Sequence, residues 1–292
     1  MCEPKLHHYV PQFYLRYFCD QSGRIWVWDK KSQKVFQTTS NRVAAGTHFY
    51  RVPEFIGTEV DPLFLENDLA NLEGKASSIL RSCIELFDTM QPMDYLDIED
   101  EDRWTLSYFI AVQFLRTSEQ RDILALFALE NGSYKNGISQ EEKTNLHAQM
   151  LCSGGLVESI AQRIFGSIWI YARNRTNTPF WTSDNPIAFK TGDNRMWLKG
   201  PGIFSSGSYV VFPLTPSYVL YCKEPKHWSS IKKIDSCLSP VAFTDEMVQH
   251  ENSGQVFMAT RHVISAFKEF SWAEEFVKSI GTDIYAPKDG IQ

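Results

Sequence analysis

The 292-residue sequence lacks the short motifs that mark several large enzyme classes. It contains no G-x-x-x-x-G-K-[ST] loop, no G-x-G-x-x-G, no H-E-x-x-H and no G-x-S-x-G elbow. These absences disfavour a nucleotide-hydrolysing P-loop enzyme, a Rossmann dehydrogenase and an α/β-hydrolase.

Cysteine pairs and long apolar runs are also missing. None of the six cysteines forms a C-x-x-C motif, so a cysteine zinc site is not expected. No apolar run reaches the length of a membrane span, and Arg16 and Asp20 interrupt the apolar part of the first 20 residues, unlike a secretory signal. We therefore expect a cytoplasmic protein with reduced cysteines and no membrane segment.

The chain has no excess of positive charge. Its 29 Lys and Arg residues against 35 Asp and Glu residues give a formal net charge of -6, which argues against a broad basic surface for duplex nucleic acid. A local phosphate site needs only a few residues and stays open. Aromatic residues make up 14% of the chain, so a packed globular core is expected over most of its length.

The sequence pattern changes twice along the chain, and we expect one α+β domain over residues 1–292 rather than two independent domains. Residues 1–55 should form an N-terminal αβ unit, residues 58–166 a helical segment, and residues 167–292 a β-rich segment with C-terminal helices. An N-terminal helix and β-hairpin, a central helical segment and a C-terminal mixed sheet would then share one core.

The N-terminal unit is defined by its alternation of apolar residues. Pro11 suits the first turn of a short helix over QFYLRYF. The segment RIWVWDKKSQKVFQT is typical of a β-hairpin in which Ile25 and Val27 face away from Trp26 and Trp28.

Capping residues predict where two further helical segments begin. Ser40 and Asn41 start a brief helical turn that Gly46 ends, and THFYRV should follow as a strand. Asp61 is the expected N-cap of a longer helix, with Pro62 at its first position.

The middle of the chain has helical periodicity. One long helix is expected over WTLSYFIAVQFLRTSEQRDILALFALE, buried where it is apolar on nearly all sides between Trp104 and Leu115. Two more helices should span about 139–152 and 155–166. Short β-rich runs then lead to a helix from about 243 to 259, a strand over RHVISAF, a helix over SWAEEFVKSI and a polar tail.

The adjacent histidines His7 and His8 are the first candidates for chemistry. Neighbouring residues of a strand point to opposite faces, so both rings cannot easily bind one metal ion. His8 is the candidate general base or metal ligand, and His7, Gln12 and Asn41 are candidate binding residues. A surface strand with two partly exposed rings explains the histidine pair equally well.

The segment TSDNP, residues 182–186, is the second candidate. Asp184 would stand at a strand-to-turn corner as a catalytic residue or metal ligand, with Ser183 and Asn185 as binding residues. These residue types are also the usual turn formers, and ordinary turn chemistry is the interpretation that the composition favours.

The segment FIAVQFLRTSEQR supplies a polar stripe in an apolar helix. The stripe lies on one helix face and comprises Phe109, Gln113, Arg116 and Gln120. If buried, Arg116 needs a partner, which could be a bound carboxylate or phosphate, with Gln113 beside it, or else Glu66 or Glu73 of the preceding helix. If exposed, the stripe is a solvated face. Glu66, a candidate catalytic carboxylate, is about 10.5 Å from Glu73 along a helix axis, too far for these two alone to chelate one ion.

A second polar stripe occurs in TDEMVQHENSGQVFMATRHV. It comprises Gln249, Asn252, Gln255 and Arg261. A solvated helix face is the favoured interpretation of this stripe.

Four segments, in this order, resemble one family. HHYVPQFYLRYF, FIAVQFLRTSEQR, PFWTSDNP and FPLTP are similar to the prokaryotic HHYVP proteins, which share the domain of unknown function 4238. The resemblance covers nearly the whole chain and implies that these segments meet in a shared architecture. It implies no activity, but it favours a role for His8, Arg116 and Asp184. Ser118 stands where other members carry a proline, which could alter the helix end there.

Two functions fit these residues. The first is a metal-assisted or acid–base hydrolase for a phosphodiester or nucleotide, with His8 as base or metal ligand, Asp184 as ligand or orienting group, Arg116 holding the anion and Glu66 as a second carboxylate. A divalent metal is its candidate cofactor, and a nucleotide or single-stranded nucleic acid its candidate partner. The second is a binding module, without turnover, for a small anionic ligand or a protein partner. In a third, plainer case the histidine pair only fixes the N-terminal helix to the core.

Overall fold

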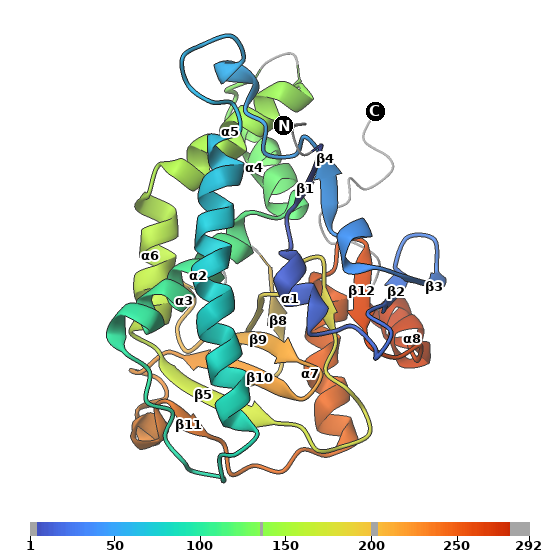
Figure 1. Cartoon of the computed structure of the whole chain (residues 1–292), viewed down its shortest axis with the longest axis vertical. Helices are drawn as coiled ribbons and strands as arrows, with labels where there is room; N and C mark the ends of the chain where they lie inside the picture. Colours follow the sequence, from blue (N-terminus) through green and yellow to red (C-terminus); the bar gives the residue numbers. More distant parts are fainter. Residues whose placement is uncertain (1–4, 135–136, 200–203, 281–292) are drawn as a thin grey trace.

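The computed structural model describes residues 5–134, 137–199 and 204–280 and confirms the α+β fold class (Figure 1). The predicted polar tail lies outside the described residues. In these three ranges, no helix combines the length and the apolar character that crossing a bilayer requires.

The helices cluster in the middle of the chain and return near its end. They are α1 (Gln12–Arg16), α2 (Phe64–Phe87), α3 (Asp100–Leu115), α4 (Ser118–Glu130), α5 (Gln140–Cys152), α6 (Gly155–Phe165), α7 (Asp245–Met258) and α8 (Ser271–Ile280), with short 3-10 turns η1 (Ser40–Arg42), η2 (Pro53–Phe55) and η4 (Ser229–Ile234). The strands are β1 (Leu6–His8), β2 (Ile25–Asp29), β3 (Lys34–Thr38), β4 (Ala45–Thr47), β5 (Ile168–Arg173), β6 (Thr182–Ser183), β7 (Ala188–Lys190), β8 (Trp197–Leu198), β9 (Tyr209–Thr215), β10 (Tyr218–Lys223), β11 (Cys237–Leu238) and β12 (His262–Ser265).

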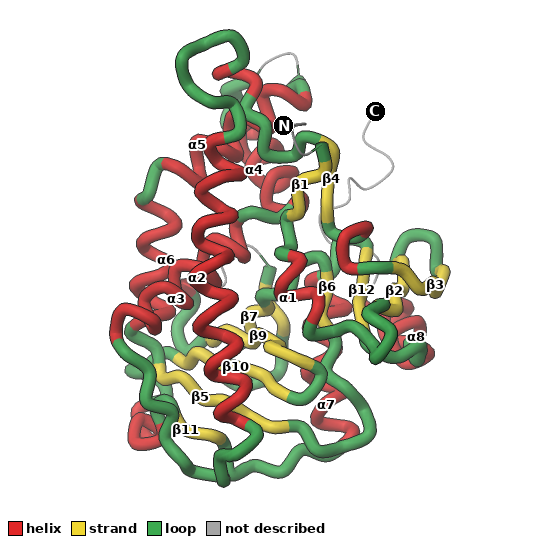
Figure 2. The backbone as a smooth tube through the Cα atoms, in the orientation of Figure 1, coloured by secondary structure: helices red, strands yellow, loops and turns green. Residues whose placement is uncertain are grey.

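A six-stranded sheet, in the order β11-β5-β10-β9-β7-β8, is buried on both faces. Its strands pair antiparallel except for β11 with β5. Successive side chains of a strand alternate between faces. Val210 and Phe212 therefore pack with the main core of the protein, whereas Tyr209 and Val211 pack towards α7. Figure 2 shows α2, α3 and α6 on one side of this sheet and α7 on the other.

A four-stranded sheet, in the order β3-β2-β12-β6, joins distant parts of the chain. The predicted hairpin forms β2 and β3, and β2 pairs with β12, so that Val27 lies opposite Ile264. The predicted faces are confirmed, because Val27 packs in the main core and Trp28 in a second core with α7 and α8.

Two predictions near the N-terminus are wrong. The strand expected over THFYRV is instead β4, which ends at Thr47, and Gly46 lies inside it rather than ending a helix. Pairing of β4 with β1 decides this boundary, because Gly46 lies opposite His7. The helix expected from Asp61 begins at Phe64, and the Asp61 carboxylate accepts a hydrogen bond from the Leu63 amide (2.9 Å) before the helix.

The single helix predicted over residues 104–130 is two helices. Its first half is buried as predicted, but the chain leaves the helical conformation at Thr117, which is extended, and α4 starts at Ser118. The carbonyl of Leu115 accepts a hydrogen bond from His147 (2.9 Å), and that of Arg116 accepts one from Tyr50 (2.7 Å). Side chains from other elements thus satisfy the last carbonyls of α3, which allows the helix to end there.

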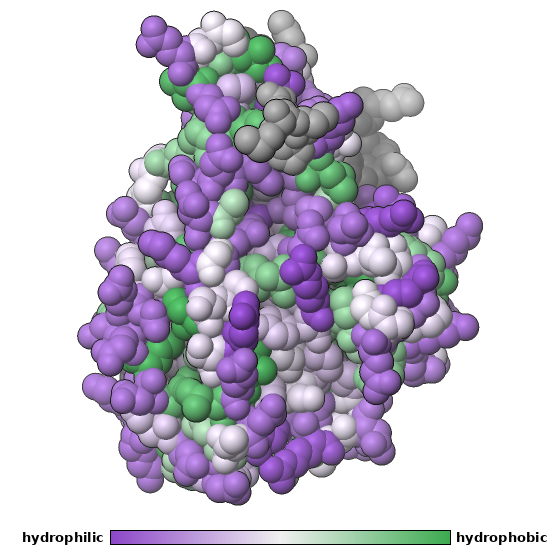
Figure 3. Space-filling model, viewed as in Figure 1, coloured by the Kyte–Doolittle hydropathy of each residue, from purple (hydrophilic) through white to green (hydrophobic). Residues whose placement is uncertain are grey.

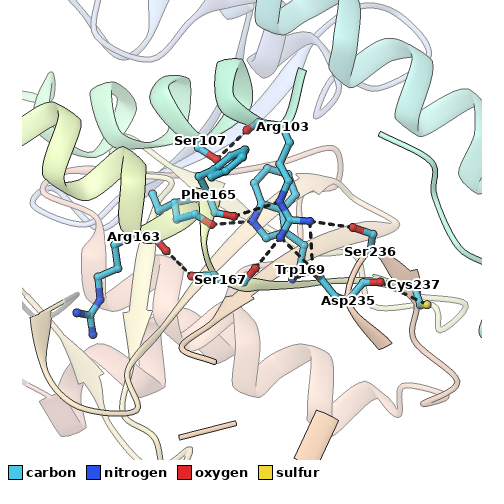
Figure 4. Close-up of polar contacts among 10 residues, drawn as sticks. Arg103, Ser107, Arg163, Phe165, Ser167, Trp169, Asp235, Ser236 and Cys237 are labelled. Carbon is cyan, nitrogen blue, oxygen red and sulfur yellow. Dashed lines mark hydrogen bonds and ion pairs between the residues drawn. The ribbon is translucent and has the colours of Figure 1, made fainter. Parts of the chain in front are cut away.

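Arg103 holds α3 to the edge of the large sheet (Figure 4). Its five N–H donors are directed at the carbonyls of Phe165 and Ser167, at both carboxylate oxygens of Asp235, and at the Ser236 hydroxyl. Its guanidinium also lies over the Trp169 ring, 4.9 Å from the centroid. One side chain thus fixes the α6–β5 turn and the entry to β11 against α3.

We predict that Arg103→Lys lowers the free energy of unfolding by about 2–3 kcal/mol, because a lysine keeps the charge but not the fork of donors. Chemical denaturation measures the change. Arg42→Lys, at an exposed position on η1, is the control and should change stability by less than about 0.5 kcal/mol. Equal effects of the two substitutions would contradict the role given to Arg103.

Candidate functional site

A cavity of about 370 Å³, open to solvent, lies between α1, α2 and the end of β1. It is lined by His8, Gln12, Phe13, Arg16, Glu66, Ala70, Glu73, Gly74 and Ser77, and we name it the His8 cavity. The lining residues of α2 recur at helical spacing and therefore share one face. Both helices lie on the face drawn in Figure 3, where hydrophilic residues predominate along α2.

His8 is a half-buried, neutral imidazole at this cavity. Its Nε2 lies 3.2 Å from the carbonyl oxygen of Asn41, which can only accept a hydrogen bond, so Nε2 carries the proton. Its Nδ1 lies 3.4 Å from the Gln12 amide nitrogen, which donates to it. Burial lowers the pKa of His8 below 6.5. The basic nitrogen is therefore Nδ1, and Gln12 positions the ring. Asn41, a predicted binding residue, contacts His8 through its backbone carbonyl and not through its side chain.

His7 has a structural position, on the opposite side of β1. It is fully buried, so the interpretation with two partly exposed rings is wrong for His7. Its Nδ1 accepts a hydrogen bond from the Tyr50 amide (2.9 Å). A nitrogen that accepts a hydrogen bond carries no proton, so the His7 ring is neutral. The 3.8 Å contact between His7 Nδ1 and the Glu66 carboxylate is therefore not an ion pair. His7 does not line the His8 cavity.

Glu66 is the titratable acid of the cavity. Burial, reinforced by the nearby Glu73 carboxylate, raises its pKa from 4.5 to about 7, although the Arg116 cation acts in the opposite direction. Glu66 is therefore largely protonated up to neutral pH. A half-buried carboxylic acid beside a neutral imidazole is the combination that general acid–base catalysis requires.

Arg116 lies behind the cavity rather than in it. It is 1% exposed and forms an ion pair with Glu73 (2.8 Å), as one of the predicted alternatives expected. It also donates to the His8 carbonyl (2.5 Å) and to the Tyr50 hydroxyl (3.3 Å). The Arg116 side chain does not line the cavity, so it is not placed to bond to an anion there, and its direct binding of a ligand anion stays a prediction.

Gln113 is likewise part of the protein framework. It is 1% exposed, and its amide donates to the Tyr9 carbonyl (3.0 Å). It does not line the His8 cavity, so the binding role predicted for it stays a prediction. Together with Arg116 it attaches the strand and turn of the HHYVP segment to the end of α3.

Asp184 belongs to a second, separate network. Its carboxylate accepts hydrogen bonds from the backbone amides of Thr260, Arg261 and His262 at 2.9–3.0 Å, and it is 1% exposed. Burial raises the pKa of Asp184 to about 6, although those three amides act to lower it. Backbone amides bond to both carboxylate oxygens, and Asp184 does not line the His8 cavity, so the structure does not bring Asp184 together with His8. The catalytic and metal-binding roles of Asp184 stay predictions.

The residues beside Asp184 secure the end of α7. Asn185 donates to the Met258 carbonyl (3.1 Å) and to the Thr260 hydroxyl (2.8 Å), and Ser183 donates to the side chain of Gln255 (2.9 Å). Neither side chain lines the His8 cavity, so the structure does not bring Ser183 and Asn185 together with His8, and their binding roles stay predictions. The polar side chains of TSDNP thus form hydrogen bonds that hold the end of α7 and the residues after it.

The solvated face predicted for α7 is correct only at its ends. Arg261 is exposed and Gln249 is half-buried, but Asn252 and Gln255 are each 1% exposed. Asn252 bonds both the Trp181 amide (2.8 Å) and the Pro179 carbonyl (2.9 Å). Gln255 bonds to the TSDNP segment and Asn252 to the residues just before it, which the spacing along α7 alone could not reveal.

The donors of the candidate metal site do not come together. In the parts of the chain that the structure describes, no group of three or more His, Cys, Asp and Glu side chains is arranged to hold a metal ion. His8 and Asp184, the predicted ligands, belong to separate networks. The residues present thus do not fit a metal centre built on this pair.

A larger hollow of about 450 Å³ lies on another side of α2. Its polar lining includes Asp97, Glu99, Glu101 and Asp102, but no histidine or arginine. Burial raises the pKa of Cys83, its one cysteine, to about 11, which makes that thiol a poor nucleophile. Although this hollow is larger than the His8 cavity, it has no imidazole base, no guanidinium and no reactive thiol among its lining residues.

Sequence reasoning missed Arg16 and Ser77 of the His8 cavity. Arg16 lies four residues after Gln12 on α1, and Ser77 lies eleven after Glu66 on α2. Residues four or eleven positions apart on a helix share a face, so the spacing from Gln12 and Glu66 could have predicted both.

The family can now be assigned. The model of DUF4238, described as a protein of unknown function, matches residues 6–269. The chain belongs to the DUF4238 family. No curated protein and no solved structure matches it. The segments of this DUF4238 protein that carry the resemblance build the Arg116 network behind the His8 cavity and the Asp184 network at the end of α7.

We predict that Glu66→Gln stabilises the protein above pH 7. The pKa of Glu66 is higher in the folded protein (about 7) than its ordinary 4.5, so its contribution to stability is complete below pH 4.5 and is lost as the pH rises to 7. At pH 8 the variant should unfold with about 2–3 kcal/mol more free energy than the parent, and at pH 4 with an equal value. Denaturation at both pH values tests this. A Glu66→Gln protein with equal stabilisation at the two pH values would contradict the pKa assigned to Glu66.

We predict that Asp184→Ala lowers the free energy of unfolding by about 3 kcal/mol or more, because three backbone amides lose their acceptor. Thermal and chemical unfolding measure the loss. Asp193→Ala removes an exposed turn carboxylate and should cost about 1 kcal/mol or less. A fully stable Asp184→Ala protein would show that this network is dispensable.

Proposed function

We propose that the His8 cavity is the active site of an acid–base hydrolase that cleaves a phosphodiester in a nucleotide or a short single-stranded nucleic acid. The observation that carries the proposal is the pairing, in one cavity, of a neutral His8 with a Glu66 carboxyl whose pKa is raised to about 7. Ionising a half-buried carboxylate is unfavourable for folding, and such groups concentrate at functional sites.

The two groups have complementary roles. The reaction requires the long 3.4 Å hydrogen bond from the Gln12 amide to His8 Nδ1 to be exchanged for one from a water molecule. Nδ1 then accepts a proton from that water, whose oxygen forms a new bond to phosphorus. Glu66 donates its proton to the leaving oxygen as the old phosphorus–oxygen bond breaks. A proton transfer from the imidazolium to the Glu66 carboxylate, through water, restores the starting state.

The charges around the cavity suit a singly charged anion. Arg116 neutralises Glu73 through the ion pair at 2.8 Å, and Glu66 is protonated. The exposed Arg16 then leaves one net positive charge at the rim. A phosphodiester carries one negative charge, and a guanidinium binds phosphate oxygens in a bidentate manner.

The acid–base form of the reaction is preferred over the metal-assisted form because the described donors do not form a metal site. A cytoplasmic location belongs to the same proposal and is supported by the five cysteines of the described residues, all of which are free thiols.

We predict that the parent hydrolyses bis(para-nitrophenyl) phosphate or a short single-stranded oligonucleotide, and that His8→Ala and Glu66→Gln each reduce kcat by about 100-fold or more. The rate should peak between the lowered pKa of His8, below 6.5, and about pH 7, because the base must be neutral and the acid protonated. In Glu66→Gln the decline above pH 7 should vanish from the residual rate.

Gly74 offers a matched pair of variants for the same assay. A Cβ added there meets no atom within 4 Å, so Gly74→Ala should keep activity, whereas Gly74→Phe should fill the cavity and abolish it while the fold is retained. Full activity of His8→Ala and Glu66→Gln would refute the mechanism. Stabilisation of the parent by a nucleotide, without any turnover, would instead establish a binding module.

A further inference from the structure

Gln120 is a buried polar residue that the proposed function does not use. The sequence places it in one stripe with Gln113 and Arg116, which bond to the backbone of the HHYVP segment, but the break at Thr117 puts Gln120 on the next helix, α4. Gln120 is only 8% exposed, yet no side chain or backbone group of the described residues forms a hydrogen bond with its amide. The Gln120 amide atoms are not among the fully buried atoms that lack a partner in the described residues, so a water molecule or a ligand can reach and bond to them.

The Gln120 side chain lines a second cavity of about 160 Å³, formed where α3 ends against α4, α5 and α6. Phe114, Leu115 and Ile160 are buried and form its floor. Phe127 and Phe204 are exposed and stand at its rim. The remaining lining is aliphatic or methionine, so the Gln120 amide is the one polar side chain among the described residues of this cavity.

The size and lining of this cavity define its ligand. A dry apolar cavity of about 150 Å³ holds one benzene molecule, and three phenylalanines offer edge and face contacts to an aromatic ring. The Gln120 amide can both donate and accept a hydrogen bond.

We propose that the Gln120 cavity binds a small aromatic molecule that carries one hydroxyl or ring N–H, with the ring on the apolar floor and the polar group on the Gln120 amide. The proposal is independent of the His8 cavity, because the two cavities share no lining residue.

Phenol and toluene are the probes, because they match in size and differ in the hydroxyl. Titration calorimetry of the full chain, supported by saturation-transfer NMR, should show the parent binding phenol about fivefold more tightly than toluene, the value of one hydrogen bond. Gln120→Leu removes the amide without breaking a side-chain hydrogen bond to the described residues. It should fold with an equal or higher Tm and lose the preference for phenol.

A matched pair of variants locates the site. Leu156→Trp places a large ring at the mouth of the cavity, where Leu156 is 40% exposed, and should abolish binding of both probes. Leu126→Trp makes the same change at a position of α4 that is 42% exposed and does not line the cavity, and should leave binding unchanged.

Three results would overturn the proposal. They are the absence of saturable binding to the parent up to the solubility of the probes, equal affinity for phenol and toluene in the parent, and binding to a folded Leu156→Trp protein as tight as to the parent. Retention of the phenol preference in Gln120→Leu would exclude the amide as the recognition group.

Discussion

The ion pair between Arg116 and Glu73 is the interaction on which the site depends. A guanidinium that is 1% exposed must be neutralised and hydrogen-bonded, because an unpaired buried charge is strongly destabilising. Glu73 supplies the charge, and the His8 carbonyl and the Tyr50 hydroxyl accept hydrogen bonds. The same side chain therefore joins α2, β1 and the end of α3, and it fixes the backbone of His8 next to the two carboxylates of α2.

This arrangement gives the two carboxylates of α2 different roles. Glu73 is committed to Arg116, whereas Glu66 is left half-buried with no cation bonded to it among the described residues, and its pKa rises to about 7. Two identical groups on one helix face thus become a structural anion and a titratable acid. Environment, rather than residue type, separates them, as in other acid–base sites.

The sequence predicted the fold better than the site. Hairpin faces, the buried helix from Trp104 and the helices of the second half follow from periodicity within one segment. The break after Arg116 could not be predicted in this way, because Tyr50 and His147 cause it from distant segments. Among the polar residues predicted for the site, His8 and Glu66 line one cavity, whereas Asp184 and Gln113 are buried and bond to the backbone. Spacing along the chain cannot distinguish these cases, because the partners of Asp184 lie more than 70 residues away.

The titration of the Glu66 side chain tests this account most directly. Carbon NMR of the carboxyl group, assigned by comparison with the Glu66→Gln protein, follows its protonation against pH in the intact chain. The account predicts a midpoint near pH 7 for Glu66, with the His8 imidazole titrating below pH 6.5 in the same sample. A Glu66 midpoint near its ordinary 4.5 would contradict the account, because the cavity would then hold a second carboxylate and no acid.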